Sequence, residues 1–153
     1  MTTADARRPF SKHARVRARR SAVQALYQWE MTHASVADVI AEFIRDRSEL
    51  KKADLDYFIT LLQGATGRVV EIDTGLAPFL ARPLYELDPV ERAIMRLGMY
   101  ELLCNADVPW RVVVNESVEL AKMFGAEQSY KFINGVLDKA ARKIRAAESR
   151  NML

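Results

Sequence analysis

The chain has 153 residues, half of them apolar and 28% charged, which is the composition of one soluble globular domain with a hydrophobic core. No apolar run approaches the roughly 18 residues of a membrane span, and the lone Cys104 excludes an internal disulfide, so we expect a cytoplasmic protein without membrane contact. The net charge of +3 hides seven basic side chains against one acid in residues 1–20, and 16 basic against 19 acidic residues in the remainder.

Residues 1–11 are predicted to form a flexible basic arm, followed by a helical domain over residues 12–146 and a frayed tail over residues 147–153. Ser11 is the expected N-cap of a first helix that runs to about Met31. The apolar face of this helix is expected to begin only at Ala22, so its first two turns should project from the core. We therefore expect that deletion of residues 1–20 leaves a folded domain.

The basic residues of this segment point to a nucleic-acid backbone as its ligand, because guanidinium groups bind phosphates in bidentate fashion. Spacings of three and four place Lys12, Arg15 and Arg19 on one helical face. A solvated basic face is the alternative interpretation, and arginine spacing does not choose between RNA and DNA. The full set of candidates is Arg7, Arg8, Lys12, Arg15, Arg17, Arg19 and Arg20.

Apolar residues recur at three- and four-residue spacings through the rest of the chain, which predicts an all-α bundle of about six or seven helices. Gly64 and Gly67 weaken the helix that carries Val69 and are expected to mark close helix packing or a bend. A short helix between turns is expected within residues 73–87, and Gly125 should end the next-to-last helix. Residues that cap helix N-termini stand at four expected helix starts: Ser35, Asp54, Asp88 and Ser129.

Side chains that could carry catalysis or hold a metal ion are not grouped in the sequence. His13 and His33 are 20 residues apart, with no partner at metal-ligand spacing. Glu116 and Glu119 share a helical face, yet the Glu-x-x-His motif of a di-metal bundle is missing. Cys104 has no signature of a nucleophile, and no glycine-rich phosphate loop is present. We therefore expect a protein that is not an enzyme and that needs no metal or cofactor.

Aromatic residues are the second group of candidates for nucleic-acid binding, because stacking contributes about 1–3 kcal/mol per base. Packing in the core is the alternative for most of them, whereas Phe124 precedes a glycine that ends a helix and is expected at the surface. The candidates are Tyr27, Trp29, Phe124 and Tyr130.

Five segments of the sequence resemble the NusB family of bacterial transcription antitermination factors. In chain order they are residues 25–29, 86–94, 107–109, 115–125 and 131–139. The resemblance extends from residue 14 to about residue 145 and implies an all-helical fold of two packed helical subdomains. It also implies a function: these proteins bind the single-stranded boxA element of ribosomal RNA leader transcripts. They do so together with the ribosomal protein that serves as NusE, in a complex that helps RNA polymerase pass terminators.

The resemblance further implies roles for individual residues. In the family, the arginine-rich start of the first helix contributes to RNA binding. The residue matching Phe124 and the start of the last helix lie beside the RNA, and the residues matching Tyr27 and Glu91 face NusE. This region supplies further RNA-binding candidates, which are Lys122, Gln128 and Lys131.

Two positions depart from the family pattern, since Gln128 stands where an acid is common and Tyr130 where a histidine is common. Loss of a carboxylate near RNA removes a repulsion, so Gln128→Asp should weaken RNA binding, and Tyr130 offers a stacking surface. Two alternatives concern the whole chain. A self-associating homodimer could cover the RNA surface. NusB-like domains also occur fused to ribosomal RNA methyltransferases, but 153 helical residues leave no space for the cofactor-binding domain of such an enzyme.

Overall fold

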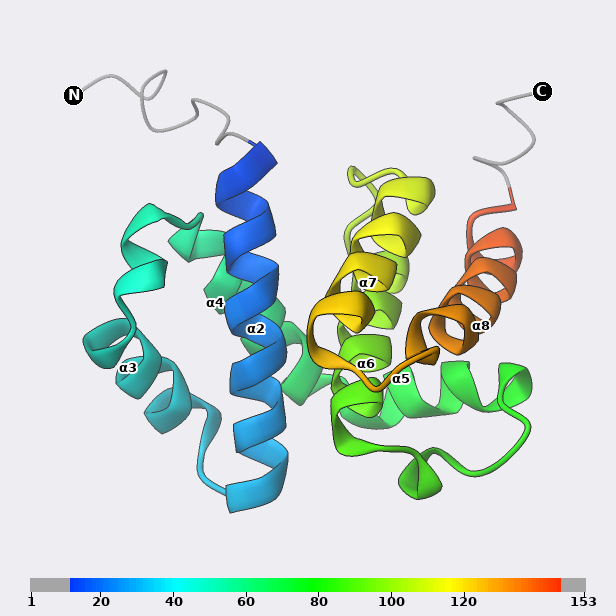
Figure 1. The fold of residues 1–153 in the computed structure, drawn as a ribbon, viewed down its shortest axis with the longest axis horizontal. Helices are drawn as coiled ribbons and strands as arrows, with labels where there is room; N and C mark the ends of the chain where they lie inside the picture. The colour runs from blue at the N-terminus through cyan, green and yellow to red at the C-terminus, as the bar shows by residue number, and fades with distance from the viewer. Residues whose placement is uncertain (1–11, 147–153) are drawn as a thin grey trace.

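A computed structural model describes residues 12–146, which form seven α-helices and three 3-10 helices and contain no strand (Figure 1). This arrangement confirms the predicted all-α bundle. The predicted arm and tail, with Arg7, Arg8 and the expected cap Ser11, lie outside the described residues. None of the described helices is both long and apolar enough to cross a membrane.

The helices fall into two groups (Figure 1). The first contains α2 (Lys12–Thr32), α3 (Val36–Asp46) and α4 (Leu55–Gly67), with a 3-10 turn at Ser48–Lys52. The second contains α5 (Val69–Leu76), α6 (Pro89–Cys104), α7 (Trp110–Phe124) and α8 (Ser129–Ile144), with 3-10 turns at Ala77–Phe79 and Leu84–Glu86. Both α2 and α4 pack against α6, which joins the groups into two packed helical subdomains.

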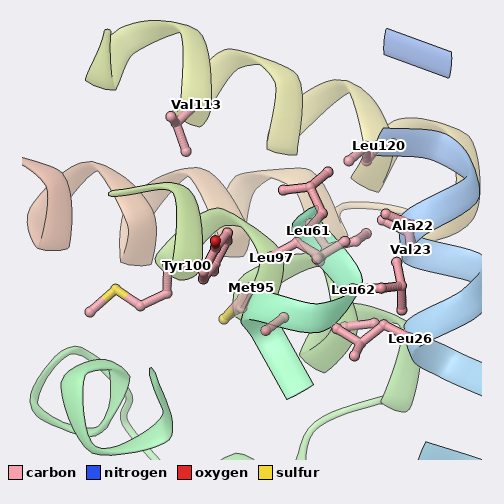
Figure 2. Packing of buried hydrophobic residues seen from close by; sticks show 14 of the residues in the cluster. Ala22, Val23, Leu26, Leu61, Leu62, Met95, Leu97, Tyr100, Val113 and Leu120 are labelled. Carbon is pink, nitrogen blue, oxygen red and sulfur yellow. The ribbon is translucent and has the colours of Figure 1, made fainter. Parts of the chain in front are cut away.

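One continuous hydrophobic core runs through both groups. Figure 2 shows Leu26 of α2 near Leu62 of α4, with Met95 and Leu97 of α6 beyond them and Leu120 of α7 above. In α7 and α8 the core residues come from one face, as the three- and four-residue spacings predicted, whereas α6 is buried on nearly all sides because both groups pack around it.

Three of the four predicted helix starts are confirmed by side-chain caps. In each case an oxygen of the capping residue accepts a hydrogen bond from a backbone N–H of the first helical turn, which would otherwise lack a partner. The pairs are Ser35 with Asp38 at 3.1 Å, Asp54 with Tyr57 at 3.0 Å, and Asp88 with Val90 at 2.8 Å.

The fourth predicted cap, Ser129, is wrong. Ser129 is the first residue of α8, and Gln128 occupies the N-cap position with a left-handed backbone at φ 73°. The Ser129 hydroxyl does not cap the helix because Ser129 lies inside α8, and this hydroxyl donates to the carboxylate of Glu91 in α6.

The middle of the chain differs from its prediction in detail. The helix that begins after Asp54 ends at Gly67, and a separate short helix starts at Val69. This helix begins before the expected residues 73–87 and overlaps them only at 73–76, while the rest of that segment holds two 3-10 turns. Gly64 does mark close packing, because a Cβ atom there would lie 2.1 Å from the Tyr100 ring. The absence of a side chain at Gly64 thus lets α4 approach α6.

The first turns of α2 do not project from the core, contrary to expectation. Ala14 and Ala18 are 5% and 0% exposed. The carbonyl oxygen of Ala14 accepts a hydrogen bond of 3.0 Å from the backbone N–H of Asp54. These small residues allow α2 to lie directly against the segment that precedes α4. Deletion of residues 1–20 would therefore remove part of the core, which corrects the expectation that such a chain stays folded.

Candidate functional site

The basic residues of α2 divide into inward and outward sets, and Arg19 points inward. Its residue is 5% exposed, and its guanidinium donates to both carboxylate oxygens of Glu101, with Nε 3.0 Å from Oε1 and Nη2 2.9 Å from Oε2. The donors and the charge of Arg19 are therefore already matched inside the fold, which leaves little of this predicted RNA-binding residue for a ligand.

A small polar cluster surrounds this ion pair. The Tyr57 hydroxyl donates to Glu101, and Asn105 donates to the Tyr57 hydroxyl at 3.2 Å. Burial raises the pKa of Tyr57, as do the charge and the hydrogen bond of Glu101. For Arg19, burial lowers the pKa, but the hydrogen bond and the charge of Glu101 outweigh it and leave the pKa above its ordinary value. The cluster thus keeps Arg19 charged and Tyr57 neutral.

Arg15 lies at the rim of the cluster. Its guanidinium is 4.2 Å from the centre of the Tyr57 ring, and its Nε is 3.4 Å from a carboxylate oxygen of Asp54. The side chain is 40% exposed, whereas that of Asp54 is 6% exposed. Arg15 therefore remains partly accessible to a nucleic acid, but Asp54 neutralises part of its charge.

Lys12, Arg17 and Arg20 form no ion pair with another described residue, which leaves their charge for a ligand. Lys12 and Arg20 line a hollow of about 420 Å³ between α2 and α7, and Glu116 and Glu119 line its opposite side. The fold thus places two acids beside a segment that is nearly free of acids in the sequence. Arg17 lies outside this hollow and is the least compensated of the three.

A second hollow of about 380 Å³ lies toward the other end of α2, and we call it the Tyr27–Phe124 groove. Its walls are mainly apolar and come from α2, α6 and α7, with Arg47 from the end of α3 at the edge. Tyr27 is 40% exposed there. The groove brings together one residue predicted to face a partner and one predicted to lie by RNA. It is lined by Val23, Gln24, Tyr27, Gln28, Met31, Thr32, Arg47, Val90 and Phe124.

The other predicted RNA-binding residues surround the turn between α7 and α8. Lys122 is exposed in the last turn of α7, with its Nζ 5.2 Å from the centre of the Tyr130 ring and 3.5 Å from a carboxylate oxygen of Glu119. Gln128 and Lys131 are exposed at the start of α8. Phe124, directly before the turn, is half-buried in the groove. The fold thus places these predicted residues close together.

Glu91 lies in the first turn of α6, beside Val90 of the groove, and accepts its hydrogen bond from Ser129. The sequence analysis missed this contact because the two residues are 38 positions apart and Ser129 has the type expected of a helix cap.

Nothing in the sequence indicated a structural role for Arg92, which is 7% exposed. Arg92 donates to Glu30 of α2 at 2.8 Å and to the carbonyl of Leu87 at 2.9 Å, and so it fixes the start of α6 against α2.

The described part of the chain contains no group of three His, Cys, Asp or Glu side chains placed to hold a metal ion. Cys104 is a half-buried free thiol at the end of α6. The candidate site therefore consists of exposed and half-buried cations, an apolar groove and a turn at a helix start, which is an arrangement for binding.

Known proteins resemble this chain in both sequence and fold. A model of the NusB family matches residues 16–142. The chain is 50% identical over 141 residues to the transcription antitermination protein NusB of Alcanivorax borkumensis, an alignment that covers 92% of this chain and 93% of that protein. It resembles T. maritima NusB with a TM-score of 0.72 and 29% identity, covering 83% of this chain and 91% of the other. It also resembles a chain in the crystal structure of antitermination factors NusB and NusE with double-stranded RNA, with a TM-score of 0.75, 26% identity and coverage of 87% and 99%.

Proposed function

The chain belongs to the NusB family, and on that premise we propose that it is a transcription antitermination factor. It binds boxA-type RNA of ribosomal RNA leader transcripts together with the ribosomal protein that acts as NusE. The observation that carries the proposal is the Tyr27–Phe124 groove, where a residue expected to face NusE and a residue expected to face RNA share one surface. The related structure of NusB with NusE and RNA supports this pairing of ligands.

The RNA surface in this proposal has two parts with different tasks. Lys12, Arg17 and Arg20, with Arg7 and Arg8 before them, attract the phosphates and supply most of the electrostatic binding energy. Arg15 adds its exposed portion. Single-stranded bases are read at the turn between α7 and α8, where aromatic and amide groups can stack and form hydrogen bonds. The residues of this second part are Lys122, Phe124, Gln128 and Lys131.

The partner surface in this proposal is the side of the groove formed by Tyr27 and Glu91. Tyr27 offers an exposed aromatic ring, the kind of side chain that anchors protein interfaces. RNA polymerase is reached through the assembled complex. We place this activity in the cytoplasm and assign it no catalytic step. A homodimer is the alternative assembly, and sedimentation with and without RNA distinguishes the two.

The test is a titration of boxA RNA against the protein, alone and with NusE, over a series of salt concentrations. A scrambled RNA of equal length is the control. We expect NusE to tighten binding of the boxA RNA more than of the scrambled RNA. We also expect the salt slope to decrease in magnitude by about 0.7 for each phosphate-binding residue removed, as in Arg17→Ala. Equal binding of both RNAs, with no effect of NusE, would contradict the proposal.

A further inference from the structure

The hydrogen bond between Ser129 and Glu91 connects the first turn of α8 to the first turn of α6. Ser129 is 5% exposed and Glu91 is half-buried, so water competes weakly for the bond. A hydrogen bond to a carboxylate under these conditions is stronger than one between neutral groups. The contact therefore restrains the start of α8 relative to α6.

The turn that ends at Ser129 is tightly built. A Cβ atom on Gly125 would lie 2.8 Å from the carbonyl oxygen of Ala121 and 3.0 Å from the Cβ of Ser129. Gln128 has a left-handed backbone, and the N–H of Ser129 donates to the carbonyl of Ala126 at 3.0 Å. With Ser129 held by Glu91, the turn that presents Gln128 is fixed at both of its ends.

The same contact lies between the two proposed ligand surfaces. Val90, next to Glu91, lines the Tyr27–Phe124 groove, and Phe124 closes the groove just before the turn. Only Oε2 of Glu91 accepts a hydrogen bond from another described residue. Its Oε1 remains available to a donor from a partner, so a partner can bind Glu91 while the bond to Ser129 stays intact.

We propose that Glu91 and Ser129 are positioning residues that hold the turn between α7 and α8 in its RNA-binding conformation and couple NusE binding to RNA binding. The inference rests on the proposed function and adds a route for cooperativity to it. A partner that binds Oε1 fixes the carboxylate in the orientation that accepts from Ser129, and the turn is then preorganised for RNA. By thermodynamic linkage, RNA strengthens NusE binding by the same factor.

The central test is Ser129→Ala, because this buried hydroxyl is not exposed to either ligand. We expect boxA RNA to bind roughly three- to tenfold more weakly, which is less than the full effect of losing a hydrogen bond to a charged group because only part of that effect reaches the RNA surface. The factor by which saturating NusE tightens RNA binding should fall toward one. NusE affinity measured without RNA should change less than RNA affinity. The matched control is Ser117→Ala, which removes another buried hydroxyl, 2.9 Å from the carbonyl of Val113, and should change neither quantity.

Substitutions at Glu91 complete the test. Glu91→Gln keeps an acceptor for Ser129 and should weaken RNA binding less than Glu91→Ala does. The double variant Glu91→Ala/Ser129→Ala should bind RNA no more weakly than Glu91→Ala alone, because both changes remove one contact. Additive losses would overturn the inference. So would a Ser129→Ala protein with a lower melting temperature but wild-type RNA affinity and wild-type coupling. Absence of boxA binding by the wild-type protein would overturn the proposed function as well, whereas normal binding that ignores Ser129→Ala would overturn the coupling alone.

Discussion

Arg19 of α2 and Glu101 of α6, which are 82 positions apart in the sequence, form a buried bidentate ion pair. Their side chains are 6% and 3% exposed. Arg19 therefore belongs to a run of basic residues by sequence and to the interior by structure. The pair joins the two helical groups, since α2 belongs to the first and α6 to the second.

Arg19→Ala should lower the free energy of unfolding by about 3–5 kcal/mol, because it leaves the Glu101 carboxylate buried without its cation. Arg17→Ala, two positions earlier on the same helix at a half-buried residue without an ion pair among the described residues, should change stability by less than about 0.5 kcal/mol and should lower RNA affinity instead. Urea unfolding and RNA titration of both variants measure the difference. Equal stability of the two variants would contradict the structural role of Arg19.

Tyr57 should make stability fall at alkaline pH. Its pKa in the folded protein is raised above the ordinary value of 10.0, first by burial and then by the charge of Glu101. As pH rises through 10.0, the unfolded chain loses the phenol proton while the folded chain keeps it. The free energy of unfolding therefore decreases, by at most about 1.4 kcal/mol per pH unit for one proton. Urea unfolding from pH 8 to 11 checks this, because Tyr57→Phe should flatten the decline, while the control Tyr85→Phe, at a residue 78% exposed, should not.

Gly64→Ala should destabilise the protein by about 1–3 kcal/mol, the usual range for an overpacked core. The new Cβ would meet the Tyr100 ring at 2.1 Å, and Tyr100 is itself only 7% exposed and has little room to move. Gly67→Ala is the matched control on the same helix, because a Cβ there meets nothing within 4 Å. It should be neutral or stabilising by up to about 1 kcal/mol. Thermal unfolding would reject the prediction if Gly64→Ala melted at or above the wild-type temperature.

Gln128→Asp should weaken RNA binding by roughly two- to fivefold, since it places a negative charge beside the proposed RNA path. Gln128→Asn separates charge from backbone effects, because Asn and Asp both tolerate the left-handed conformation at φ 73°. We expect the Asn variant to bind boxA RNA as the wild type does at the same salt concentration. If both variants lost affinity equally, the length of the glutamine side chain rather than its charge would matter.

The helix starts that could be predicted are those where the capping residue and its backbone partner are close in the sequence. Ser35, Asp54 and Asp88 were identified as helix starts because a cap acts on backbone groups two or three residues away. Ser129 has the same residue type, but its hydroxyl serves a carboxylate 38 positions earlier. Residue type and spacing carry no information about such a distant acceptor.

In the candidate site, too, the features that depend on residues distant in the sequence could not be predicted. The sequence identified the basic segment of α2 but could not separate Arg19 from Arg17, because the separation depends on Glu101 in another helix. One signal was present in the sequence: Glu101 is an acid within an otherwise apolar stretch of α6, and a buried carboxylate requires a cation. The family resemblance named Tyr27 and Phe124, but only the fold places them in one groove.

Arg145, just past the end of α8, reaches back to the end of α6, where its guanidinium donates to the carbonyl oxygens of Glu101 and Asn105 at 3.0 Å and of Leu102 and Val108 at 2.9 Å. These acceptors include carbonyls of the last helical turn of α6, which have no partner within that helix. During synthesis on the ribosome, α6 emerges some 40 residues before the side chain that completes its C-terminal end. The second helical group should therefore reach its final stability only late in translation.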